Sequence, residues 1–146
     1  ELVEMNDFQP YIDLIELVNG SLSFVELKGI TDTRLRNDTS RNSKKPEILK
    51  QMEKYQLFIQ KYEVDIKAYY KKMLQIKKDL GVITFDKFDL IINTKPKLII
   101  VDTYKIITSG KAKRISAIKE LLESNQIDYE ILKLKRENSI SLANIN

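Results

Sequence analysis

The sequence of 146 residues contains neither cysteine nor histidine. Without cysteine the chain can form no disulfide and no zinc ribbon, and it has no thiol nucleophile. Without histidine it can carry neither a Ser-His-Asp triad nor a histidine-based metal or nuclease site. A bound metal would therefore be held mainly by carboxylate, carbonyl and water oxygens, which suit Mg²⁺, Mn²⁺ or Ca²⁺. A general base would be Lys, Asp, Glu, Tyr or a water molecule that the metal activates.

Long apolar runs are also missing. No stretch approaches the roughly 18 consecutive apolar residues of a membrane-spanning helix, and no secretory signal is visible. We therefore expect no membrane partner and, by default, a cytoplasmic location. The first residue is Glu1 rather than methionine, and it lies close to a strong strand signal. We expect residues 1–146 to be one domain that lacks some upstream residues.

The composition is that of an ordinary globular domain with many surface charges. Hydrophobic residues make up 42% and charged residues 32% of the chain, and the charged fraction is above the usual quarter. A chain of this length can bury a core without cross-links. The net charge of +4 is compatible with a nucleic-acid partner but does not establish one.

The first structured segment predicted is a β-hairpin. In residues 11–28, two runs rich in Ile, Leu, Val and Phe flank Asn19-Gly20, the strongest short-range hairpin signal. Residues 29–45 are rich in Thr, Ser, Asn and Arg, which predicts a mobile basic loop. That loop either grips phosphates or is simply solvated, and the sequence favours neither. Its basic residues are Arg34, Arg36, Arg41, Lys44 and Lys45.

The remaining pattern alternates helices and strands. Apolar residues spaced by three and four predict a long helix from Pro46 to about Leu80, with a break near 63–65 and a stop at Gly81. Residues 98–101 predict a strand buried on both faces. We expect a helix over 111–124, a strand over 128–134 and a weakly ordered tail over 136–146. This order predicts an α/β or α+β domain with a mixed central sheet flanked by helices.

The register of the hairpin brings charged residues together. A two-residue turn at Asn19-Gly20 places Asp13 directly opposite Glu26, with Cβ atoms about 4.5–5.5 Å apart. Lys28, two residues after Glu26, lies on the same face of the strand. The rest of that face is apolar and is expected to be buried; it consists of Ile15, Leu17, Leu22 and Phe24.

Two facing carboxylates repel each other, and this conflict predicts a cation. Like charges directly opposite one another destabilise a strand pair, whereas a divalent cation between them removes the repulsion. Two carboxylates, a backbone carbonyl and waters make a suitable Mg²⁺ site. Lys28 can position or deprotonate a water molecule, or stabilise charge that develops on phosphorus. These groups are sufficient to hydrolyse a phosphodiester.

The same residues form a recognisable motif. Asp13, twelve intervening residues and then Glu26-Leu27-Lys28 resemble the PD-(D/E)XK nuclease superfamily. The resemblance implies a restriction-endonuclease-like fold. It also implies that Asp13, Glu26 and the Leu27 carbonyl bind Mg²⁺ or Mn²⁺ and that Lys28 is catalytic. One departure is that Ile12, rather than proline, precedes Asp13; the nearest proline is Pro10.

A second motif begins the long helix. Gln51 and Tyr55 form a Q-x-x-x-Y pattern similar to that of the superfamily branch containing RecB nucleases and lambda exonuclease. The loop before this helix is also similar in layout to the stand-alone defence nucleases called Shedu. The resemblance adds Gln51 and Tyr55 to the catalytic set, since i and i+4 side chains share a helix face. A tyrosine on an apolar stripe is, however, most often a core residue.

The function expected from these residues is Mg²⁺-dependent hydrolysis of DNA, in defence, restriction or DNA processing. Such nucleases often work as dimers or larger rings, so we expect a homo-oligomer or a part of a larger chain. One alternative is a catalytically inactive module on the same fold that binds nucleic acid or protein. The other is an unrelated α/β domain with a structural role, which would place Asp13 and Glu26 on opposite faces of the sheet.

Overall fold

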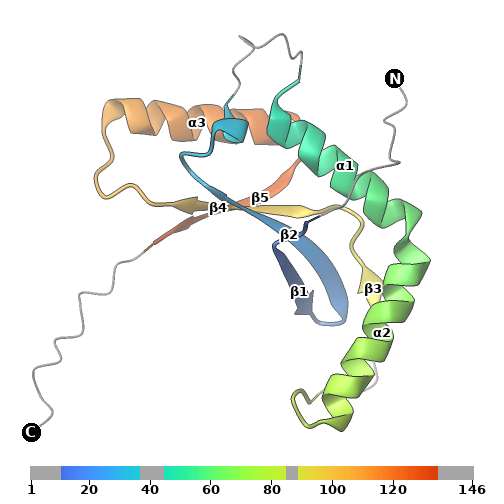
Figure 1. The fold of residues 1–146 in the computed structure, drawn as a ribbon. Helices are drawn as coiled ribbons and strands as arrows, with labels where there is room; N and C mark the ends of the chain where they lie inside the picture. The colour runs from blue at the N-terminus through green and yellow to red at the C-terminus, as the bar shows by residue number, and fades with distance from the viewer. Residues whose placement is uncertain (1–10, 37–44, 85–88, 135–146) are drawn as a thin grey trace, which may run out of the picture.

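The computed structural model describes residues 11–36, 45–84 and 89–134, which form a mixed α/β domain (Figure 1). Five strands make one sheet in the order β1-β2-β4-β5, and β3 also pairs with β2. The predicted class, a mixed sheet with helices, is confirmed. No helix in this part of the chain is long and apolar enough to cross a membrane. The strands are β1 (Leu14–Val18), β2 (Ser21–Gly29), β3 (Ile91–Ile92), β4 (Lys97–Asp102) and β5 (Asp128–Lys133), and the helices are α1 (Glu47–Lys61), α2 (Glu63–Asp79), α3 (Ser109–Ser124) and the short 3₁₀ helix η1 (Thr33–Leu35).

The hairpin has the predicted turn and register. Asn19 and Gly20 both have positive φ, 50° and 82°, as a two-residue type I′ turn requires. Ile15 pairs with Phe24, as the turn predicts, but the ladder ends where Leu14 pairs with Val25. The predicted strand therefore begins too early: Asp13 lies one residue before β1 rather than inside the ladder.

The hairpin face that was expected to be buried is buried on β2 alone. Leu22 and Phe24 are 1% and 4% exposed, whereas Ile15 and Leu17 on β1 are 44% and 36% exposed. The reason is position in the sheet, because β2 lies inside and β1 lies at the edge. The prediction of a fully buried hairpin face was wrong for β1.

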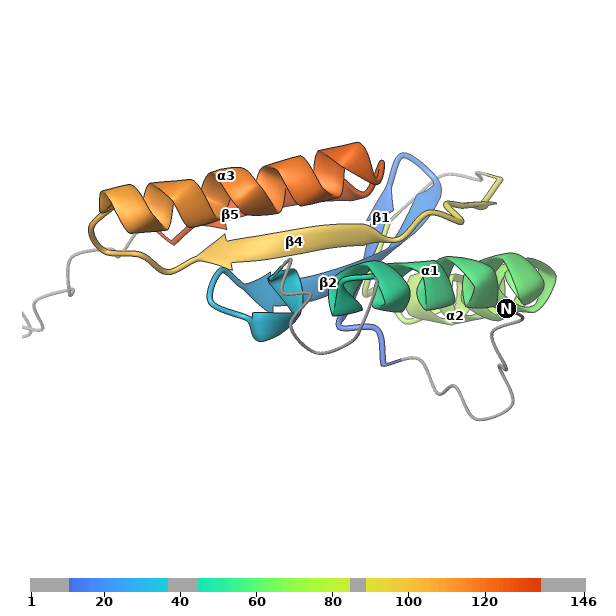
Figure 2. The same cartoon turned by 90° about the horizontal axis from the view of Figure 1, so that it is seen from above.

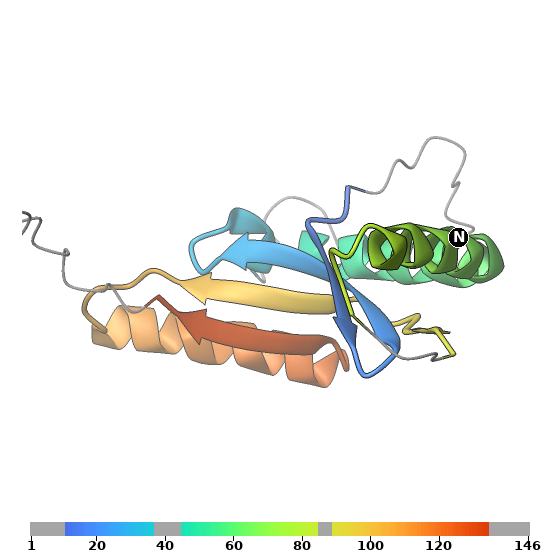
Figure 3. The same cartoon turned by 90° about the horizontal axis from the view of Figure 1, so that it is seen from below.

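All three α-helices cover one face of the sheet. The apolar residues of both core clusters on β2 and β4 lie on this face, and α3 lies over β5 when seen from above (Figure 2) and behind β5 when seen from below (Figure 3). Parallel strands need such helical crossovers: α1 and α2 link β2 to its parallel neighbour β4, and α3 links β4 to the parallel β5. No described helix covers the opposite face.

Strand β4 shows the effect of this one-sided cover. Leu98 and Ile100 point toward the helices and are fully buried, while Ile99 and Val101 on the other face are only partly buried. The expectation of a strand buried on both faces was therefore wrong within the described residues. A run of four apolar residues does not reveal how many of its two faces are covered.

The core has two parts, which divide the covered face between them. The first lies under α1 and α3 and includes Met52, Leu98 and Leu122; the second lies under α2 and the end of α1 and includes Phe24 and Leu74. The N-terminal half of β2 therefore belongs to the second part. Its C-terminal half pairs with β4 under the first part.

The long helical segment is broken where the sequence suggested. Tyr62 (φ −111°, ψ 20°) separates α1 from α2, one residue before the predicted break. Gly81 ends α2 with φ 69°, and its N–H donates to the Lys78 carbonyl at 2.9 Å. The glycine stop is the predicted one, because the left-handed conformation favours glycine.

The predicted mobile basic loop is ordered over its first residues. Ile30 and Leu35 are 0% and 1% exposed, and η1 forms at Thr33–Leu35. The Arg114 guanidinium of α3 donates to the carbonyls of Ile30 and Asp32, at 2.9 and 3.1 Å. Two buried apolar residues and these bonds fix the segment, so the prediction of mobility was wrong there. Residues 37–44, with Arg41 and Lys44, and the predicted tail over 136–146 lie outside the described residues.

Candidate active site

A buried ion pair lies at the C-terminal half of β2. Glu26 and Lys28 are 3% and 5% exposed, because both side chains alternate onto the face that the helices cover. The Lys28 Nζ contacts the Glu26 Oε1. Burying two charges costs free energy unless good geometry and further hydrogen bonds compensate for it. The site therefore needs more partners than this pair alone.

Helix α1 supplies part of that compensation. The Gln51 Nε2 donates to Glu26 Oε1 at 2.7 Å and also lies 2.9 Å from the Tyr55 hydroxyl, to which it donates. The Tyr55 hydroxyl in turn donates to the Tyr11 carbonyl at 2.8 Å. The i, i+4 spacing puts Gln51 and Tyr55 on the same face of α1, and that face meets β2. Tyr55 is also a core residue, 4% exposed.

Asp13 completes the group from the segment directly before β1. Its Oδ2 accepts a hydrogen bond of 2.8 Å from the Leu27 N–H, just beyond the last paired residue of the hairpin. The N–H and C=O of one strand residue point to the same side, so the Leu27 carbonyl is also directed toward the Asp13 side. Asp13 thus approaches the backbone between Glu26 and Lys28, rather than forming the ladder pair that was predicted with Glu26.

The electrostatics around Lys28 are mixed. Burial lowers the pKa of the Lys28 ammonium below its ordinary 10.5, and the Arg34 guanidinium lowers it further. The carboxylates of Asp13 and Asp32 partly oppose this shift. The net lowering of the pKa means that the Lys28 amine gives up its proton more readily than a surface lysine does. Such a shift is common at catalytic sites, although structural ion pairs also produce it.

Two oxygen atoms in the site have no hydrogen-bond partner among the residues that the structure describes. They are Glu26 Oε2 and Gln51 Oε1, and both are buried. Buried polar atoms without partners are rare and costly, and a carboxylate oxygen of this kind suits a hard cation. The donor set thus fits Mg²⁺ or Mn²⁺ with ligands from Asp13, Glu26 and the Leu27 carbonyl. The described residues contain no cluster of three or more His, Cys, Asp or Glu side chains, so water or substrate oxygens would complete the coordination.

Of the predicted nucleic-acid-binding residues, the structure describes Arg34, Arg36 and Lys45, and only Arg34 acts on the site, through its charge on Lys28. Arg34 forms an ion pair of 2.8 Å with Asp32, and Lys45 forms one of 2.5 Å with Glu53. Arg36 ends η1 and is exposed. Neighbouring carboxylates therefore already balance the charges of Arg34 and Lys45.

Some contacts of the site have no signal in the sequence. The Tyr11 carbonyl is a backbone group, which any residue would supply. Asp32 and Arg34 shift the pKa of Lys28 because the fold brings their charges near it. Asp32 does carry a local signal, since it is an Asx-type cap whose side chain accepts from the Arg34 N–H at 2.9 Å. A sequence can reveal such a cap, but it does not reveal that the cap lies close to Lys28 in the folded protein.

No family model, curated protein or solved structure matches this chain. Its function is therefore inferred from the motif and from the geometry of Asp13, Glu26, Lys28 and Gln51.

Proposed function

We propose that this domain is a metal-dependent nuclease with a restriction-endonuclease-like fold, which hydrolyses phosphodiester bonds of DNA. The observation that carries the proposal is the buried Glu26 Oε2 beside Lys28, for which residues 11–36, 45–84 and 89–134 offer no hydrogen-bond partner. Stability alone does not explain why the Glu26–Lys28 ion pair is buried, because a protein with apolar residues in place of such a pair is often equally or more stable. A role in binding a cation explains both its burial and its free oxygen.

The ligands proposed for Mg²⁺ or Mn²⁺ are the carboxylates of Asp13 and Glu26 and the carbonyl of Leu27. When bound, the ion polarises a phosphoryl oxygen and makes water more acidic. Gln51 orients the Glu26 carboxylate through its 2.7 Å hydrogen bond. Tyr55 holds the Gln51 amide in place, and its own hydroxyl is fixed by the Tyr11 carbonyl.

The proposed role of Lys28 is to act on the attacking water and on the negative charge that develops on phosphorus. Its ammonium group lies beside the proposed metal ligand, where it can orient water or stabilise the negative charge that develops in the transition state. Water is largely excluded from this position, which strengthens each electrostatic interaction. A surface lysine would contribute far less.

The direct test is cleavage of linear, circular and single-stranded DNA in Mg²⁺ and in EDTA, with an RNA of the same sequence beside them. Asp13→Asn, Glu26→Gln and Lys28→Met should each reduce Mg²⁺-dependent cleavage by at least about 10²-fold, the usual loss for such groups. Glu53→Gln on the exposed side of α1 is the matched control and should cleave normally. Full activity in any of the three site variants contradicts the mechanism.

Metal binding separates a nuclease from an inactive module on the same fold. Calorimetric titration with Mn²⁺ should show binding to the unmodified protein and a loss of that binding in Glu26→Gln. Sedimentation at several protein concentrations tests the homo-oligomer that is also part of the proposal. Absence of carboxylate-dependent Mn²⁺ binding would favour the inactive module.

A further inference from the structure

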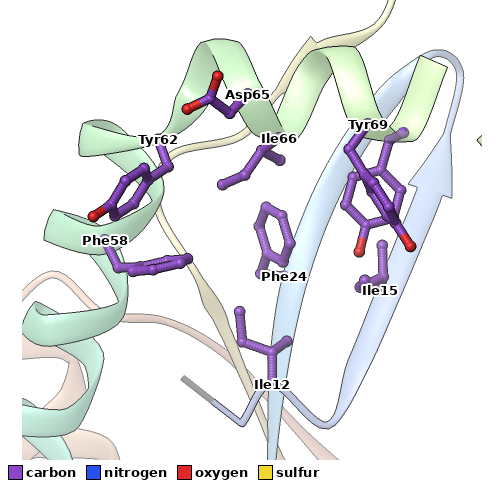
Figure 4. A pocket seen from close by; sticks show the side chains of 9 residues that line it. Ile12, Ile15, Phe24, Phe58, Tyr62, Asp65, Ile66 and Tyr69 are labelled. Atoms are coloured by element: carbon purple, nitrogen blue, oxygen red, sulfur yellow. The ribbon is translucent and has the colours of Figure 1, made fainter. Parts of the chain in front are cut away.

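An aromatic cleft lies next to the candidate active site. It has a volume of about 550 Å³, within the range of roughly 300–1,000 Å³ that is typical of ligand sites. The hairpin forms one wall, and the end of α1 with α2 forms the other (Figure 4). It is lined by Ile12, Ile15, Phe24, Phe58, Tyr62, Asp65, Ile66, Tyr69 and Tyr70.

The rings of this aromatic cleft hold one another in place. Phe24 and Tyr70 meet edge to face, with centroids 6.2 Å apart, and Tyr69 and Tyr70 do so at 5.1 Å. Phe58 and Tyr62 form a third pair at 4.8 Å. Such contacts stabilise particular ring orientations. Tyr69 is nevertheless 63% exposed, so a positioned aromatic ring is open to a ligand.

The aromatic cleft is continuous with the candidate site through β2. Phe24, which lines the cleft, and Glu26 are two residues apart on the same face, about 6.7 Å along the strand. On the facing segment, Ile12 lines the cleft and directly precedes Asp13. A molecule bound at Glu26 and Asp13 therefore has the cleft as its immediate neighbour.

We propose that the aromatic cleft stacks unpaired bases of a single nucleic-acid strand whose backbone reaches Glu26 and Lys28. This inference rests on the proposed nuclease function and narrows its substrate to single-stranded or frayed DNA. Aromatic side chains beside a basic surface are the usual means of binding single strands, because every base offers a flat face. Bases in a duplex are already stacked and would first have to be extruded.

The lysines of α1 and α2 lie outside the lining of the cleft, and their excess over carboxylates favours a polyanion over an apolar protein partner. Residues 47–79, which span α1 and α2, contain eight lysines against five carboxylates. Lys61 Nζ lies 5.2 Å from the Tyr62 ring centroid, at the edge of the cleft. Lys67 and Lys71 share the single carboxylate of Asp89, which leaves positive charge in excess beside Tyr69 and Tyr70.

Asp65 is the one acidic group in the lining, and it disfavours phosphate at its own position. A carboxylate can instead accept hydrogen bonds from the amino group of a base, as in contacts to cytosine. Tyr70 adds no negative charge, since burial raises the pKa of its hydroxyl. The chemistry of the lining thus suits bases inside the cleft and phosphates along its lysine-bearing edge.

Binding measured in EDTA tests this inference apart from catalysis. The probe is a fluorescent single-stranded oligonucleotide, compared with the same oligonucleotide carrying abasic sites and with its duplex. The variants are Tyr69→Ala, Tyr69→Phe, which keeps the ring, and Val64→Ala, a control at an exposed position of the same helix. Circular dichroism confirms that each variant is folded.

Tyr69→Ala should weaken binding of the single strand by about 5- to 150-fold, the loss expected for one stacked base. Tyr69→Phe and Val64→Ala should bind within about twofold of the unmodified protein. The abasic strand should bind weakly and should not respond to Tyr69→Ala, because it has no bases to stack. The duplex should bind more weakly than the single strand.

Three results would overturn the inference. One is equal binding of single strand, abasic strand and duplex, which indicates contact with phosphates alone. Another is unchanged binding by Tyr69→Ala while the variant still cleaves DNA in Mg²⁺, which leaves the nuclease function intact. The third is a dimer in sedimentation that Tyr69→Ala dissociates without a change in DNA binding. If base-dependent binding is found but no cleavage occurs, the nuclease proposal fails and the stacking site remains.

Discussion

Lys28→Met replaces a buried ammonium group with an apolar chain of similar length. The Glu26 carboxylate, 3% exposed, then keeps one described hydrogen bond, from Gln51. Removing one partner of a buried ion pair typically costs about 3–5 kcal/mol. The bond from Gln51 limits the loss, since hydrogen bonds to charged groups contribute about 1.5–3 kcal/mol. We expect Lys28→Met to lower the free energy of unfolding by about 3 kcal/mol.

The double variant Glu26→Gln with Lys28→Met removes both charges and should behave differently. Replacing a whole buried pair by neutral residues is often neutral or stabilising by about 1–4 kcal/mol. We therefore expect it to unfold within about 1 kcal/mol of the unmodified protein, or at higher urea concentration. The two substitutions should then be coupled by at least about 2 kcal/mol.

Urea denaturation in EDTA measures these changes, with the midpoint and the slope fitted separately. An unchanged slope shows that the compactness of the native and denatured states is preserved. If Lys28→Met unfolds at the same urea concentration as the unmodified protein, or if the two substitutions are additive, Glu26 carries no buried charge that needs a partner. The argument for a cation at Glu26 would then fail as well.

Urea denaturation of the same variants with a divalent metal present gives a second test. A ligand that binds only the native state at a hundred times its Kd stabilises it by about 2.7 kcal/mol. Mn²⁺ should therefore recover much of the stability lost in Lys28→Met, because it supplies positive charge at Glu26. It should stabilise the double variant much less, because that variant lacks the Glu26 carboxylate and keeps only that of Asp13.

Other perturbations test the fold around the site. The Arg34 side chain holds the pKa of Asp32 below its ordinary 3.8. The stability that this contributes is present above that value and is lost as the pH falls through the folded-state pKa. Asp32→Asn should thus flatten the acid limb of a stability–pH profile below about pH 4 and cost about 1 kcal/mol at neutral pH. Arg114→Lys cannot reproduce both bonds to the carbonyls of Ile30 and Asp32 and should lower the free energy of unfolding by about 1–3 kcal/mol, as measured in urea. Gly20→Ala, at φ 82°, should cost about 1–2 kcal/mol in thermal unfolding; a neutral result would contradict the type I′ turn.

The local features of the fold were predictable because their causes are local. Asn19 and Gly20 determine the turn and, through it, the register of every pair in the hairpin. Helical spacing put Gln51 and Tyr55 on one face of α1. These rules depend on neighbours within a few residues, which the sequence displays directly.

The features that were missed depend on distant parts of the chain. Whether β1 or β2 lies at the sheet edge decides which of Ile15 and Phe24 is buried, and no periodic pattern records it. Ile30 and Leu35 are single apolar residues in a polar segment, so they gave no sign of belonging to the core. Strand β3, with two residues, is too short to leave any pattern.

The candidate site was predicted in its members more than in its contacts. Asp13, Glu26 and Lys28 were expected together from the strand alternation; the described contacts join Lys28 to Glu26 and Asp13 to the Leu27 N–H between them. The bond from Asp13 to the Leu27 N–H replaced the expected ladder pair, because β1 begins at Leu14, one residue later than expected. The sequence does not define the end of a strand ladder to within a single residue.

Leu27 occupies an unusual position with respect to the two faces of the sheet. Its backbone lies between Glu26 and Lys28 and bonds to Asp13, whereas its side chain points to the opposite face, where it pairs alongside Ile99. A change in the volume of that side chain would act on the peptide group to which the Asp13 carboxylate is hydrogen-bonded. A substitution at Leu27 or Ile99 that changes side-chain volume but no charge would therefore shift the Leu27 peptide group in the candidate site from the opposite face of the sheet.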